Sequence, residues 1–178
     1  MNAWTAPDGA IVTIRAVRPA DFELEREFVS ALSPLTGYQR LMSTRTPSFD
    51  ELRRFTDVDP SREVALIATT EVGGRERQVG VARYVKDEVR PGEAEFAIVL
   101  ADAWQGRGLG RALLAALIEE ARREHLRRLV GTTLSENEGM LRLARRLGFS
   151  LALNPESALV TDLKLDLAGM RQNAAKPA

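Results

Sequence analysis

Cysteine is absent from the 178-residue sequence, which excludes disulfide bonds, thiolate zinc sites and a cysteine nucleophile. Histidine occurs once, as His125, at the end of a predicted helix and beside several arginines. A solvated helix-end residue is the favoured interpretation, and no His/Asp/Glu cluster indicates a metal site. Net charge is also absent, since Lys plus Arg and Asp plus Glu are 25 each. The overall charge therefore gives no reason to expect binding to nucleic acid or to a membrane.

Long apolar runs are missing as well. No window approaches the roughly 18 apolar residues of a membrane span, and the first ten residues do not resemble a signal peptide. A cytoplasmic protein without a membrane segment is therefore expected. The length, with 44% apolar and 28% charged residues, predicts one soluble globular domain. Basic residues cluster around 107–128 and 142–146, which indicates a local anion site rather than a generally basic surface.

The stretch 95–122 organises the rest of the chain. Residues 95–100 form a short apolar run headed by an acid, residues 105–110 contain three glycines, and from Leu109 apolar residues recur at helical spacing. A strand that enters a helix through glycines leaves the backbone N–H groups of the first helical turn free to bind an anion. Arg107 and Arg111 add positive potential, and the ligand expected here is a pyrophosphate.

Three known phosphate-binding patterns can be tested against this loop. The P-loop fails, because neither Lys nor Ser/Thr follows Gly110. The dinucleotide-binding fingerprint would need glycine where Arg111 stands and an acid in the basic region 127–129, so a nicotinamide-dependent enzyme is a remote alternative. The third pattern, [QR]-x-x-G-x-[GA] after a strand, is satisfied by Gln105, Gly108 and Gly110. The alternative without a ligand is that the glycines merely turn a strand into a helix.

A second block, Leu134–Phe149, follows at a suitable distance. Ser135 and Glu138 are spelled as an S-x-x-E capping box, and Gly148 suits the left-handed residue that ends a helix. The two blocks resemble the GNAT superfamily of N-acetyltransferases. Their spelling, with the opening 14–21 and Leu32-Ser33-Pro34, is closest to the acetyltransferase domain of bacterial Pat-type protein lysine acetyltransferases, and the resemblance covers roughly residues 11–165.

The pattern and the resemblance together predict an α/β (α+β) fold with a single GNAT-like domain at 11–167. A loose lead-in at 1–10 and a disordered tail at 168–178 are expected to flank it. The sheet should be mixed and mostly antiparallel, with six or seven strands and about four helices on its faces. The expected strands are 11–17, 64–69, 78–85, 95–100, 127–134, 149–153 and 159–165. The one parallel crossover should carry the helix that begins at Leu109.

The resemblance also implies a site for acetyl-CoA as co-substrate, with no metal. In GNAT folds the fourth and fifth strands splay apart, and the fourth strand holds the pantetheine like an added strand. The backbone groups expected in that role are those of Ile98, Val99 and Leu100. Asn137 would bond the pantetheine arm or the acyl group, or would be an ordinary helix cap. Gln105 opens the loop, and backbone N–H groups would hold the pyrophosphate at Gly106, Arg107, Gly108, Leu109, Gly110 and Arg111.

Glu95 is the candidate general base, because a lysine ammonium with a pKa near 10.4 must lose a proton before it can attack. At the head of an apolar strand it is expected to be partly desolvated, although a solvated strand-end acid is the alternative. Glu93 is a second choice. Many GNAT enzymes carry a tyrosine that protonates the leaving thiolate, and Ala144 stands at that position.

The expected reaction is direct attack of a primary amine on the thioester. The amine would belong to a protein lysine, with an acyl-CoA synthetase as one candidate acceptor, and a small-molecule amine is the alternative. A non-catalytic acyl-CoA sensor is a second alternative, which the missing tyrosine favours and Glu95 does not. The sequence is compatible with a homodimer but does not fix the oligomeric state.

Overall fold

The computed structural model describes residues 2–41 and 47–167. The predicted tail at 168–178 lies outside the described residues, as do residues 42–46. The elements, in chain order, are β1 Asn2–Thr5, β2 Ile11–Ala16, η1 Pro19–Asp21, α1 Phe22–Ser30, α2 Pro34–Leu41, α3 Phe49–Thr56, β3 Glu63–Val72, β4 Arg75–Lys86, β5 Glu93–Leu100, η2 Asp102–Trp104, α4 Leu109–Arg123, β6 Arg128–Leu134, α5 Glu138–Arg146, β7 Ser150–Asn154 and β8 Ser157–Asp166.

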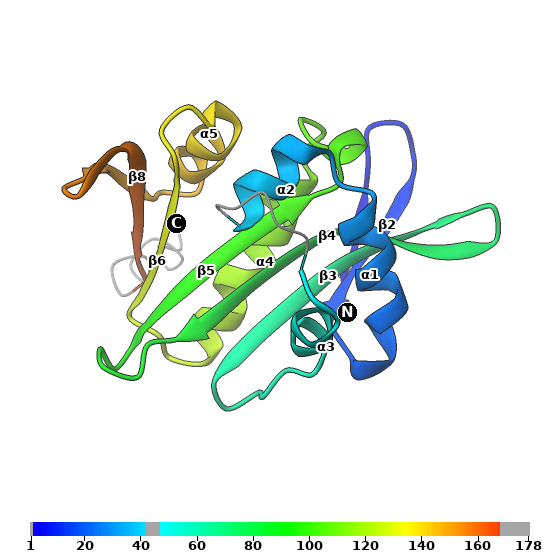
Figure 1. Ribbon diagram of the computed structural model, residues 1–178, viewed down its shortest axis with the longest axis horizontal. Helices are drawn as coiled ribbons and strands as arrows, with labels where there is room; N and C mark the ends of the chain where they lie inside the picture. The colour runs from blue at the N-terminus through cyan, green and yellow to red at the C-terminus, as the bar shows by residue number, and fades with distance from the viewer. Residues whose placement is uncertain (1, 42–46, 168–178) are drawn as a thin grey trace, which may run out of the picture.

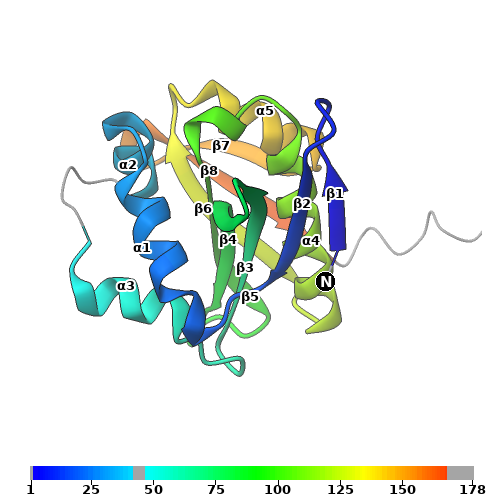
Figure 2. The ribbon, with the colours of Figure 1, turned by 90° about the vertical axis from the view of Figure 1, so that its right-hand side faces the viewer.

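The strands form one sheet in the order β1-β2-β3-β4-β5-β6-β8-β7. Every neighbouring pair is antiparallel except β5 and β6, which are parallel and are connected through α4. This confirms the predicted mixed sheet and its parallel crossover. Figures 1 and 2 show α1, α2 and α3 on one side of the sheet and α4 on the other, with α5 near β7.

Two groups of buried side chains hold these layers together. The larger lies between the sheet and α4, where Tyr84, Leu113 and Leu117 have no exposed surface. The smaller lies beneath α1 and joins Phe28 to Val99 of β5. Since β5 carries buried side chains on both faces, its position is fixed by packing from both sides of the sheet.

The N-terminal ten residues differ from the prediction. Instead of a loose lead-in, residues 2–5 form β1, which pairs with β2 from Asn2 opposite Ile14 to Thr5 opposite Ile11. The turn between them contains Gly9 at φ 87°, and the Pro-Asp-Gly triplet that ends there is a turn signal that the sequence already carried. The sheet therefore has eight strands rather than six or seven.

The helix count also differs, because Pro34–Leu41 forms α2 where the sequence analysis expected no helix. Ser33 directly precedes α2, and its C=O accepts a hydrogen bond from the Gly37 N–H (2.8 Å). Serine followed by proline at the first helical position is a helix-start signal, which the glycine inside the segment obscured. The structure thus has five α-helices in its described part rather than about four.

Candidate active site

The site is an opening between β5 and β6. The two strands pair only at Glu93 with Arg128, Ala94 with Leu129 and Glu95 with Val130. Beyond Glu95, β5 continues its pairing with β4 up to Leu100, while β6 stays paired with β8 along its whole length. The parallel neighbours therefore separate while each remains held from its other side, as Figure 1 shows. We call this separation the β5–β6 opening.

The register of β5 decides which backbone groups face this opening. Ala101 donates its N–H to the Val79 C=O (2.9 Å), which marks a hydrogen-bonded pair at the end of the β4–β5 ladder. Antiparallel strands alternate between hydrogen-bonded and non-hydrogen-bonded pairs, so the backbone N–H and C=O of Val99 also bond to β4. Ile98 and Leu100 direct theirs to the opposite side. The β5–β6 opening therefore presents backbone groups of Ile98 and Leu100 that pair with no strand, whereas those of Val99 are occupied by β4.

The glycine loop lies at the start of α4. Gly108 is the residue before the first helical turn, at φ 97°, and no side chain caps the helix there. Gly106 also has a left-handed backbone, at φ 72°. The Arg111 N–H donates to the Gly108 C=O (3.1 Å), so it belongs to the helix. The uncapped amides of Leu109 and Gly110 precede it, and such a helix start is a binding site for an anion.

A polar network connects this loop to α2. The Gln105 side chain donates to the Thr36 hydroxyl (3.2 Å) and to the Leu100 C=O (3.3 Å). Asp102 accepts bonds from the hydroxyls of Ser33 (2.7 Å) and Thr36 (2.8 Å). Desolvation opposes ionisation of Asp102, but the bonds from Ser33 and Thr36 outweigh it and hold its pKa below the ordinary value. The start of the loop and the start of α2 are therefore fixed to one another.

Two of the residues predicted to bind pyrophosphate turn their side chains elsewhere. The Arg107 guanidinium forms an ion pair with Asp8 and lies 4.6 Å from the centre of the Trp104 ring. Leu109 is completely buried in the core. Neither residue lines the cavity with its side chain, so a contribution from either one would come from the backbone, as the sequence predicted.

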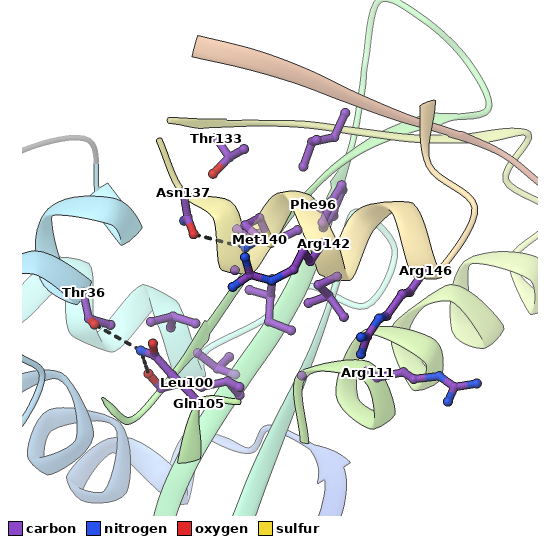
Figure 3. Close-up of a pocket in the computed structure, with 18 of the residues that line it drawn as sticks. Thr36, Phe96, Leu100, Gln105, Arg111, Thr133, Asn137, Met140, Arg142 and Arg146 are labelled. Atoms are coloured by element: carbon purple, nitrogen blue, oxygen red, sulfur yellow. Dashed lines mark hydrogen bonds between the residues drawn. The ribbon is translucent and has the colours of Figure 1, made fainter. Parts of the chain in front are cut away.

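A cavity of about 750 Å³ occupies the β5–β6 opening and extends along the loop, α4 and α5. Its volume is within the range of small-molecule and cofactor sites. Figure 3 shows the lining side chains. The cavity brings together ten of the twelve predicted site residues: Glu95, Ile98, Val99, Leu100, Gln105, Gly106, Gly108, Gly110, Arg111 and Asn137.

Glu95 lines the cavity as the last residue of β5 that pairs with β6. Its side chain is exposed, so the predicted partial desolvation is not observed. Glu93 does not line the cavity. It is 6% exposed and forms ion pairs with Arg90 (2.8 Å) and Arg128 (3.1 Å). Of the two acids, only Glu95 has access to a bound substrate.

Asn137 is the cap of α5, and its side-chain oxygen accepts a bond from the Met140 N–H (3.1 Å; Figure 3). The predicted Ser135–Glu138 capping box is wrong, because Ser135 instead bonds with its hydroxyl to the Ala158 C=O (3.2 Å) and to the Thr161 hydroxyl (2.9 Å). Gly148, two residues after the last residue of α5, has a left-handed backbone at φ 87°, as predicted.

Several residues that line the cavity were not named from the sequence. Thr36 comes from α2, and Thr132 and Thr133 come from β6. Arg83 stands opposite Ala97 in the β4–β5 register and donates to the Phe55 C=O (2.6 Å). None of these could be found from local spacing, because each reaches the cavity through strand register or helix docking. Arg142 and Arg146 also line it, and they belong to a basic cluster that was visible in the sequence.

The fold, with its splayed parallel strand pair and uncapped helix start, has the arrangement expected of an acyl-CoA-dependent transferase. Residues 12–150 match the family model described as Acetyltransferase (GNAT) domain. The chain therefore belongs to the GNAT family of acetyltransferases. It is an acyltransferase that uses acetyl-CoA as its co-substrate.

Similar proteins support this assignment. Acetyltransferase PA5475 of Pseudomonas aeruginosa is 34% identical over 152 residues, which are 85% of this chain and 81% of that protein. Acetyltransferase Pat of Mycolicibacterium smegmatis is 30% identical over 76% of this chain, which spans only 40% of that protein. A short region, 34% of this chain, is 41% identical to 36% of an L-methionine sulfoximine/L-methionine sulfone acetyltransferase of Pseudomonas aeruginosa.

Solved structures agree with the sequence comparisons. The GNAT domain of S. lividans PAT superposes with a TM-score of 0.80 at 27% identity, and the match covers 93% of this chain and 96% of that chain. The structure of yncA from Salmonella typhimurium contains its cofactor acetyl-CoA; it superposes with a TM-score of 0.67 at 25% identity, over 94% of this chain and 98% of its own. In the described part of the present chain, no helix is both long and apolar enough to cross a membrane.

Proposed function

We propose that this acetyltransferase transfers the acetyl group to a primary amine, that of a protein lysine side chain, with Glu95 as general base. The observation that carries the proposal is the position of Glu95. It is the last β5 residue paired with β6, so its exposed side chain stands where the opening begins. The free backbone groups of Ile98 lie three residues further along the same strand. A base and an oxyanion donor are thus set on one rigid strand.

The chemistry follows from this arrangement. The Ile98 N–H would donate to the thioester oxygen, and the amine nitrogen would attack the thioester carbon. Glu95 would accept the ammonium proton, directly or through one water molecule. The C–S bond then breaks and coenzyme A leaves as a thiolate, which takes, directly or through water, the second proton that the amine nitrogen loses as the amide forms. An ordinary thiol has a pKa near 8.5, so the small buried Ala144 at the usual tyrosine position does not prevent this step.

A protein lysine is favoured by the Pat-type resemblance over most of the chain and by the high structural similarity to the S. lividans PAT domain. Glu95 and Ala97 are both exposed on one face of β5, which leaves room there for an acceptor presented on the surface of another protein. The short match to L-methionine sulfoximine/L-methionine sulfone acetyltransferases supports a small amine as the second candidate. The cytoplasm as its location and a homodimer remain part of the proposal.

The test uses the Glu95→Gln variant with free coenzyme A release as the readout. Acceptors are a lysine peptide panel, acyl-CoA synthetases and L-methionine sulfoximine. We expect turnover to fall by about 10²-fold or more while acetyl-CoA binding is retained. Glu71→Gln is the matched control, since Glu71 is an exposed strand acid outside the cavity. Full activity of Glu95→Gln at neutral pH would exclude Glu95 as the base, and binding without acceptor-dependent release would favour a sensor.

A further inference from the structure

Arginines from two different helices meet at one part of the cavity. Arg111 lies in the first turn of α4, Arg146 is the last residue of α5, and both line the cavity. Figure 3 shows the Arg146 side chain extending towards the start of α4, where Arg111 lies, on the opposite side of the view from Thr36 and Gln105. The cavity therefore has a cationic part that is separate from the network around Gln105.

These two arginines differ from the other cations near the site. Arg142 pairs with Glu138 (2.7 Å) and Arg107 pairs with Asp8. Across residues 2–41 and 47–167, neither Arg111 nor Arg146 forms an ion pair, and both are exposed. Two uncompensated guanidinium groups that line one cavity from two helices repel each other in the absence of an anion. Their arrangement indicates an anionic ligand group.

We infer that Arg111 and Arg146 bind the 3′-phosphate of coenzyme A and make the enzyme select 3′-phosphorylated acyl-CoA. Coenzyme A carries two anionic groups, the diphosphate next to the pantetheine and the monoester on the ribose. The uncapped amides of Leu109 and Gly110 suit the diphosphate, and the Arg111 amide is already used inside the helix. The next anion along the ligand is the 3′-phosphate, and Arg111 is the next residue along the chain.

The chemistry of the side chains agrees with this assignment. A phosphate monoester carries close to two negative charges at neutral pH and has three acceptor oxygens. Guanidinium groups bind such oxygens through paired N–H donors, whereas a diester diphosphate next to a helix start is satisfied by backbone amides. The inference rests on acetyl-CoA as the co-substrate. It does not depend on Glu95 or on the identity of the acceptor.

The experiment is calorimetric titration of the full chain with coenzyme A and with 3′-dephospho-coenzyme A, so no acceptor is needed. We expect the wild-type protein to bind coenzyme A about 10-fold more tightly than the dephosphorylated form. Arg146→Gln and Arg111→Gln should each reduce that ratio, and the double variant should bring it to about 1. For Arg146→Gln, which lies outside the glycine loop, affinity for 3′-dephospho-coenzyme A should remain unchanged. The ratio should also fall as salt is added, because the contact is exposed.

Arg145→Gln is the matched control. Arg145 is an exposed arginine one position from Arg146 on the same helix, but it does not line the cavity. Its variant should keep the wild-type ratio. Equal affinities of the wild-type protein for both ligands would overturn the inference, as would an equal loss for both ligands in Arg146→Gln or the same effect in Arg145→Gln. Failure to bind either ligand would overturn the acetyl-CoA site itself, an outcome distinct from loss of selectivity alone.

Discussion

Replacement of Gly108 by alanine tests the anion-binding loop directly. Gly108 has φ 97°, a backbone conformation that costs a residue with a Cβ atom about 1–2 kcal/mol. A Cβ atom there would lie 3.5 Å from the Trp4 ring, which is an ordinary contact, so the packing itself permits the change. The predicted loss of stability is therefore the backbone cost alone, about 1–2 kcal/mol, or about 2–8 °C in Tm for a chain of this size.

The second expected effect is on the ligand. Relaxation of the strained residue would move the Leu109 and Gly110 amides that follow it. We expect affinity for coenzyme A to fall by about 10-fold or more, since each charge-assisted hydrogen bond contributes about 1.5–3 kcal/mol. Thermal unfolding measures the first effect, and calorimetric titration with coenzyme A measures the second.

Gly74→Ala provides a control matched for strain. Gly74 has φ 76° in the β3–β4 turn, with no atom within 4 Å of its ideal Cβ position and no contact with the cavity. It should lose a similar amount of stability and bind coenzyme A like the wild-type protein. If Gly108→Ala bound coenzyme A with wild-type affinity while losing the expected stability, the diphosphate would have to lie elsewhere. The loop would then be only a connection between strand and helix.

Three further predictions concern the body of the fold. Burial raises the pKa of Tyr84 to about 12, and its hydroxyl finds no hydrogen-bond partner among the described residues, so Tyr84→Phe should raise the free energy of unfolding by about 1 kcal/mol. Desolvation would raise the pKa of Asp21, but the Arg15 guanidinium (2.7 Å) outweighs it and lowers that pKa. The ionised Asp21 therefore stabilises the fold at pH values above its unfolded pKa of about 3.9, and this stabilisation is lost as the pH falls through its lower folded pKa. Gly131→Ala would place a Cβ atom 2.9 Å from the Phe96 ring and 3.0 Å from its C=O oxygen, so we expect about 1–3 kcal/mol of destabilisation and weaker coenzyme A binding.

Each of these has a clear contrary result. Denaturant unfolding of Tyr84→Phe that showed a loss of stability would mean that the hydroxyl has a partner. Acid unfolding of Asp21→Asn should be less dependent on pH than that of the wild-type protein below about pH 4, and an unchanged profile would show that the ion pair contributes nothing. Wild-type stability of Gly131→Ala would show that β6 moves away from β5 without cost.

Local signals in the sequence predicted the parts of the site that local geometry decides. The glycines at 106 and 108 have left-handed backbones because the chain must turn from β5 into α4 there, and Gly148 ends α5 for the same reason. The Gly73-Gly74 turn is a further example. Such positions depend on a few neighbouring residues, so spacing and residue type are sufficient to find them.

Tertiary pairing decided what the sequence analysis got wrong. Ser135 was expected to cap α5, but its N–H donates to the Leu159 C=O (2.9 Å) and continues the pairing of β6 with β8. The residue that caps α5 is instead Asn137, two residues after Ser135. Glu95 was expected to be partly desolvated by its apolar strand, yet β6 leaves β5 at that residue and the side chain is exposed. Neither outcome follows from the spacing of residues along one segment.

The register of β5 explains why the proposed base and the free backbone groups occur together. β4 holds β5 along its whole length, so the strand stays straight when β6 departs after Glu95. That departure has two consequences. It exposes the side chain of Glu95, the last paired residue, and it leaves the backbone groups of Ile98 and Leu100, which point towards β6, without a strand partner. A shift of β5 by one residue relative to β4 would turn the backbone groups of Val99 to the opening and would also reverse the face on which residue 95 lies. The positions of the proposed base and of the proposed acyl-binding backbone therefore both follow from one feature of the sheet, the residue at which two parallel strands stop pairing.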